Sequence, residues 1–148
     1  MTFKEYQKLV KEHGETDSIK CREAIESKVF NTACKLVVKL NRLYAKYGQA
    51  FIEDDDYRED RGGFSLDMVG SDSVMLIYYD SWQYGGECEF GVTVQMKYLD
   101  EPELVKLEEE LKAKRIKALE ASVKHLEESL ELVGEELNKA RAELKQLK

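Results

Sequence analysis

Carboxylate side chains crowd into a short stretch near the middle of the chain. Six acidic residues lie between positions 53 and 60, interrupted only by Tyr57 and Arg58. Such oxygens are the ligands that hard divalent cations take, but Arg58 stands where a calcium-binding loop would need another oxygen. We therefore expect no metal site and an exposed acidic loop over 49–63. Its candidate partner-binding residues are Asp54, Asp55, Asp56, Glu59 and Asp60.

Cationic side chains recur at helical spacing earlier in the chain. They are Lys28, Lys35, Lys39, Arg42 and Lys46. At about 100° per residue these positions share one narrow helix face. A basic stripe of this kind is an electrostatic footprint for phosphate, so nucleic acid is one candidate partner. The alternative is a solvated face, or one that pairs with the acidic loop. The stripe lacks interleaved aromatic residues for base stacking, and a net charge of −7 opposes nucleic-acid binding.

An aromatic pair marks a third candidate, the turn between two expected strands. Trp82, the only tryptophan, and Tyr84 lie just before Gly85 and Gly86. Aromatic side chains on a rigid hairpin are typical of a protein-binding hot spot. A turn folded back onto the core is the alternative interpretation.

Nothing in the spacing of histidines and cysteines indicates catalysis. His13 and His125 are far apart, and the three cysteines, Cys21, Cys34 and Cys88, form no C-x-x-C motif. This pattern predicts free thiols in a reducing cytoplasm rather than a disulfide framework or a zinc site. We expect no enzyme, no cofactor and no metal.

Composition and charge place these residues on a soluble chain with long helices. Charged residues make up 36% of the 148 positions, above the usual quarter. Residues 1–48 carry ten Lys/Arg against six acids, residues 49–100 three against twelve, and residues 101–148 ten against twelve. No membrane span or signal peptide is expected, which favours a cytoplasmic location.

Periodicity predicts an α+β domain over 1–100. Helices are expected at about 3–13, where Thr2 and Glu5 form a capping-box pattern, and at 18–47. The period then changes to two, which predicts strands at about 64–69, 74–80 and 88–98 in an antiparallel meander. The middle strand is apolar on both faces, so we expect it in the centre of the sheet.

The segment 101–148 is predicted to form one long helix, because Pro102 and the acids beside it are typical of a first helical turn. From Ile116 a heptad pattern runs unbroken to the end and predicts a coiled-coil seam. The a positions are Ile116, Val123, Leu130, Leu137 and Leu144, and the d positions are Leu119, Leu126, Val133, Ala140 and Leu147.

A second apolar stripe precedes the seam in a different register. It consists of Leu104, Leu107 and Leu111, and the basic stretch 112–115 separates it from Ile116. We expect the first stripe to pack on the α+β domain and the seam to pair with another copy, most simply as a homodimer. Docking of the seam on the helix 18–47 of the same chain is the alternative, and the flanking charges leave parallel and antiparallel pairing open.

The stretch Val74–Gly86, with its W-x-Y-G-G turn and a following strand that ends at Tyr98-Leu99, resembles small uncharacterised bacteriophage-encoded proteins. In those proteins a helical part precedes a similar hairpin. The resemblance covers about thirty residues and leaves out the heptad segment. It implies a phage accessory protein that acts in the host cytoplasm, and it transfers no chemistry to any residue.

Taken together, these patterns favour a non-enzymatic, oligomeric protein-interaction module. The expected activity is to bind and inhibit or modulate a host or phage macromolecule, for example a host defence protein or a nucleic-acid-processing protein. A nucleic-acid-binding protein that uses the basic stripe is the first alternative. A structural virion or assembly component is the second.

Overall fold

A computed structural model describes residues 1–82 and 85–146, except for the side chain of Trp82. The chain divides into two compact units, Met1–Glu109 and Glu110–Lys148. The first unit contains two helices, a three-stranded antiparallel sheet and the start of the last helix, which confirms the predicted α+β class. That last helix, α3, spans Glu101–Gln146 and makes up the described part of the second unit.

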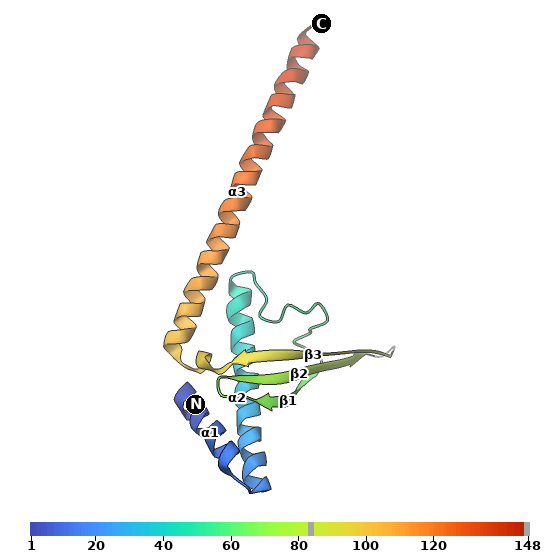
Figure 1. Cartoon of the computed structure of the whole chain (residues 1–148). Helices are drawn as coiled ribbons and strands as arrows, with labels where there is room; N and C mark the ends of the chain where they lie inside the picture. The colour runs from blue at the N-terminus through green and yellow to red at the C-terminus, as the bar shows by residue number, and fades with distance from the viewer. Residues whose placement is uncertain (83–84, 147–148) are drawn as a thin grey trace. The chain divides into compact units, whose positions relative to one another are not determined.

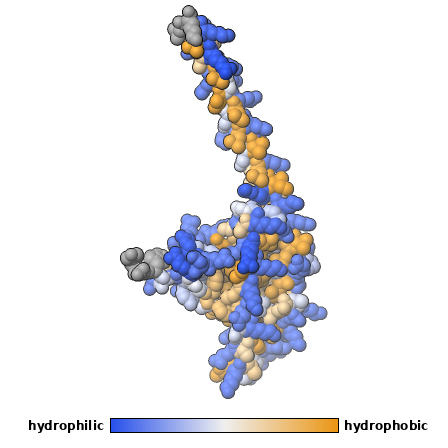
Figure 2. Space-filling model, turned by 180° about the vertical axis from the view of Figure 1, so that it is seen from behind, coloured by the Kyte–Doolittle hydropathy of each residue, from blue (hydrophilic) through white to orange (hydrophobic). Residues whose placement is uncertain are grey.

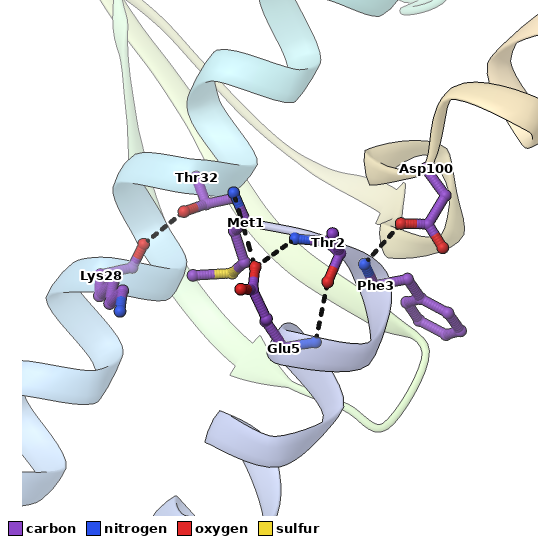
Figure 3. Close-up of polar contacts among 7 residues, drawn as sticks. All are labelled: Met1, Thr2, Phe3, Glu5, Lys28, Thr32 and Asp100. Carbon is purple, nitrogen blue, oxygen red and sulfur yellow. Dashed lines mark hydrogen bonds and ion pairs between the residues drawn. The ribbon is translucent and has the colours of Figure 1, made fainter.

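The first helix, α1, spans Phe3–Glu15 and begins at the predicted capping box. The Thr2 hydroxyl accepts a hydrogen bond from the Glu5 amide at 3.3 Å, and the Glu5 carboxylate accepts one from the Thr2 amide at 2.7 Å (Figure 3). The amide of Phe3 donates to Asp100 at 2.9 Å, which ties the start of α1 to the residue before α3. Gly14 does not end the helix, so the expected boundary at residue 13 was two residues short.

The second helix, α2, spans Ile19–Lys46, and Ser18 caps it by accepting from the Cys21 amide. Its buried residues form one apolar stripe at Val29, Ala33, Leu36, Val37 and Leu40. Figure 1 shows α2 crossing the sheet. The stripe therefore supplies the helical half of the core.

The sheet contains β1 (Gly63–Val69), β2 (Ser73–Trp82) and β3 (Gly86–Gln95) in the order β1-β2-β3. The middle strand is central, as predicted. The third strand begins and ends earlier than expected, because a 3-10 helix, η1, occupies Met96–Leu99. The Met96 amide donates to the Asp72 carbonyl at 2.8 Å, and this bond to the β1–β2 turn accompanies the change from strand to helix.

One face of the sheet completes the core. Val74 faces Val94 and Leu76 faces Val92 in the β2–β3 register, and all four side chains are buried. Tyr78 continues this row and is 1% exposed. At the start of α3, Leu104 and Leu107 are buried, and Leu111 is buried one turn later. This first stripe of α3 therefore belongs to a buried surface, in contrast to the seam that follows it.

Tyr6 joins α1 to the hairpin between β1 and β2. Its side chain is fully buried, and its hydroxyl contacts the carbonyl oxygens of Gly70 and Ser73, the latter at 3.2 Å. Burial raises the pKa of the Tyr6 hydroxyl to about 12. The neutral hydroxyl therefore serves as a donor to these two part-buried carbonyls.

Replacing Tyr6 with phenylalanine is expected to lower the free energy of unfolding by about 1 kcal/mol, because the ring stays while the part-buried carbonyls of Gly70 and Ser73 lose the hydroxyl donor. Urea unfolding followed by near-UV circular dichroism measures the change. An unchanged midpoint would show that the hydroxyl does not hold the turn.

Candidate interaction surfaces

The heptad seam is the largest apolar surface of the second unit. Its described leucine, isoleucine and valine side chains are between 47% and 71% exposed, and Ala140 is exposed as well. Figure 2 shows hydrophobic residues following one another along α3. A single helix cannot bury its own stripe, so this surface has no packing partner within the unit. Leu147, the last predicted seam position, lies outside the described residues.

The positions that flank the seam are compatible with close packing. Ser122 and Ser129 occupy g positions, and their hydroxyls donate to carbonyls of their own helix, at Ala118 (3.0 Å) and His125 (2.9 Å). These hydroxyls can therefore enter an interface without losing a hydrogen bond. Lys124 and Glu128 form an ion pair at 3.9 Å on positions b and f, away from the seam.

Two lysines of the basic stripe form ion pairs with glutamates at the start of α3. Lys39 pairs with Glu101 at 3.5 Å, and Lys46 pairs with Glu108. The hydrogen bond to Glu108 raises the pKa of Lys46. Tyr47 donates to the same carboxylate at 2.8 Å. The two pairs are each one heptad apart on both helices, so α2 and the start of α3 run in the same direction here.

Two of the five stripe residues therefore serve intramolecular contacts. Lys28, Lys35 and Arg42 remain exposed on α2. Three cations on one helix face give a smaller footprint for phosphate than the five that the sequence offered. The sequence suggested the acidic loop as an internal partner for the stripe, whereas the ion pairs found for it lie with α3.

The acidic loop is exposed but has a defined conformation. Asp54 accepts from the amide of Asp56 at 2.9 Å, and the guanidinium of Arg58 donates to the carbonyls of Asp55 (2.6 Å) and Tyr57 (2.8 Å). Asp54, Asp55, Asp56, Glu59 and Asp60 are all exposed. Within residues 1–82 and 85–146, no group of three potential ligands is placed to hold a metal ion.

Buried Tyr78 and half-buried Tyr57 hold this loop against the sheet and α2. The Tyr78 hydroxyl accepts from the Arg58 amide at 3.2 Å and lies within hydrogen-bonding distance of the carbonyls of Arg58 and Arg61. Tyr57 packs edge-on against Tyr78, with ring centroids 5.1 Å apart, and its hydroxyl accepts from Asn41 at 2.9 Å. The carboxylates are thus displayed on a loop whose backbone is fixed to the sheet and to α2.

The remaining candidates form no chemical site. Cys21 is exposed, and Cys34 and Cys88 are half-buried free thiols; burial raises the pKa of Cys34. His13 contacts Glu26 through Nε2 at 2.7 Å, which links the end of α1 to α2. Of the predicted hairpin pair, Tyr84 lies outside the described residues, and so does the side chain of Trp82.

Sequence reasoning missed one surface, the face of the sheet opposite the core. Met75, Ile77 and Tyr79 alternate with the buried residues of β2 and therefore point to this second face. Tyr79 is 52% exposed, and Met68, which faces Met75 from β1, is 54% exposed. The signal was visible in the apolar character of both faces of β2, which central placement alone does not explain.

Comparison with known proteins finds no match to this chain, whether among family models, curated proteins or solved structures. In the described part of the chain, no helix has the length and apolar character needed to cross a membrane.

Proposed function

We propose that this chain is a non-enzymatic protein-interaction module that self-associates through the heptad seam of α3. The observation that carries the proposal is the seam itself. Every a and d position from Ile116 to Leu147 is apolar, in a segment that is otherwise rich in charge. Contiguous exposed apolar patches mark interaction sites, and a heptad period is the pattern that two helices need to interlock.

A second copy is the simplest partner for this seam. In the first two heptads β-branched Ile116 and Val123 occupy a, and Leu119 and Leu126 occupy d. This distribution favours two strands in those heptads, whereas Leu130 at a with Val133 at d in the next heptad does not. No a or d position carries a charge, so pairing two seams leaves no charged side chain buried at a seam position.

The oligomeric state tests this proposal directly. Sedimentation equilibrium of the full chain at tens of micromolar is expected to give twice the monomer mass, and dissociation on dilution. A strict monomer at this concentration would overturn the proposal and favour docking of the seam on α2 of the same chain. A larger assembly with saturable stoichiometry would retain self-association but not the dimer.

The first unit would then be presented in two copies to a macromolecular partner. The acidic loop supports this role, because its backbone is already held by Tyr78 and binding a basic surface then costs less entropy of loop ordering. The resemblance to phage-encoded proteins adds the proposal that this partner is a host protein, which the chain inhibits or modulates.

A further inference from the structure

The outer face of the sheet is apolar where an exposed antiparallel sheet is normally polar. In the register of the three strands, Ser65, Ile77 and Gly91 form one row, and Met68, Met75 and Thr93 form the next. Ile77 is thus flanked on both sides by small residues. A side chain added at Gly91 would meet no atom within 4 Å, so the space beside Ile77 is open.

Tyr79 closes one end of this apolar strip. A Cβ built on Gly63 would lie 2.9 Å from the Tyr79 hydroxyl oxygen, so the ring lies across the glycine of the neighbouring strand. Two methionines at the other end, Met68 and Met75, are flexible side chains that adapt to varied partners. The strip therefore combines the Tyr79 ring, which lies across Gly63, with two flexible methionine side chains. This combination suits the binding of apolar side chains.

The charges around the apolar strip indicate which charge its partner carries. The strands β1 to β3 contain no lysine or arginine, and their exposed charged residues are Asp67, Glu87 and Glu89. Two such faces brought together would confront their carboxylates without a cation between them, which disfavours a second copy. A partner with both apolar and cationic side chains can pack on the apolar strip and pair with the surrounding carboxylates at the same time.

We propose that the outer sheet face, formed by Met68, Met75, Ile77 and Tyr79 and rimmed by Asp67, Glu87 and Glu89, docks a basic, apolar segment of another protein. This inference rests on the proposed role as an interaction module but not on the seam. It adds a surface within the first unit that would bind whether or not the chain dimerises.

Methionine methyl groups report on this surface without any change to the protein. Met68 and Met75 lie on the outer face, whereas Met96 is fully buried in the core. The full chain labelled at methionine methyl carbons is titrated with a short soluble peptide of alternating valine and lysine. We expect the Met68 and Met75 signals to shift in a saturable manner and the Met96 signal to stay in place.

Two matched peptides separate the apolar from the charged contribution. A serine–lysine peptide retains the charge and a valine–glutamate peptide retains the apolar residues, and both are expected to bind more weakly. Exchanging Glu87 and Glu89 for lysine is expected to weaken binding of the valine–lysine peptide by about fivefold, as the loss of exposed ion pairs should do. Equal binding of all three peptides, or no shift at Met68 and Met75, would overturn the proposal.

The same titration on the Leu130→Asp variant keeps this inference separate from self-association through the seam. Binding of the valine–lysine peptide should be the same in both chains. If Met68 and Met75 signals instead move with protein concentration in Leu130→Asp without peptide, the outer face pairs with a second copy, and the proposed basic partner is wrong.

Discussion

Replacing Leu130 with aspartate is expected to turn a self-associating chain into a monomer. Leu130 is an a position in the middle of the seam and is 71% exposed in the single chain. In a paired seam two such aspartates would share one apolar layer. Their desolvation costs about 3 kcal/mol or more, which raises the dimer Kd roughly a hundredfold. Sedimentation equilibrium and far-UV circular dichroism measure the two consequences, since an isolated helix is marginal in water and loses helicity when its partner leaves.

Leu132 provides a matched control only two residues away. It is 64% exposed, almost as much as Leu130, but it occupies the outward c position of the heptad. Leu132→Asp makes the same chemical change on the same helix and is expected to leave the Kd within about twofold, as surface substitutions do. Equal loss of association in both variants would show that the contact surface is not the heptad seam, and unchanged association in both would exclude the seam from the interface.

The fold class could be predicted from the sequence because helix caps and apolar periodicity depend on residues that are close together in the chain. The period of two that starts near Phe64 predicted the sheet, and the Thr2–Glu5 pair predicted the first helix start, which the capping hydrogen bonds confirm. The end of β3 could not be predicted in the same way. The turn into η1 accompanies a hydrogen bond between Met96 and Asp72, which are distant in sequence, and the alternation of apolar residues carries no trace of it.

The basic stripe illustrates the same limit for a candidate site. Its spacing on one helix face was correctly derived from the sequence, but the partners of Lys39 and Lys46 lie 62 residues further along the chain, at Glu101 and Glu108. Both acids also fitted the expectation for a helix start or a solvated helix face. Only the packing of the first two turns of α3 beside α2 distinguishes a free lysine from a paired one.

The apolar character of the outer sheet face was visible in the sequence. The alternation of Val74, Leu76 and Tyr78 with Met75, Ile77 and Tyr79 predicted a strand that is apolar on both sides and central, and the central position is confirmed. A central strand still needs a layer on each face to bury both sets. Among the described residues of these strands, the buried side chains lie on one face, whereas Met75 and Ile77 on the other face are half-buried and Tyr79 is exposed.

Tyr78 and Tyr79 test which face of the sheet belongs to the core. Tyr78 is 1% exposed and packs against Tyr57, Phe64 and Phe90, with ring centroids 4.9 to 5.4 Å apart. Tyr78→Ala removes this packing and the hydroxyl that holds the acidic loop, so it should lower the free energy of unfolding by about 3–5 kcal/mol, much of what a domain possesses. Tyr79→Ala, at the neighbouring but exposed position, should cost about 1 kcal/mol. Urea unfolding followed by near-UV circular dichroism compares the two. Equal losses would contradict the assignment of the outer face as a free surface, because a tyrosine that contributes as much as Tyr78 must be buried in the folded chain.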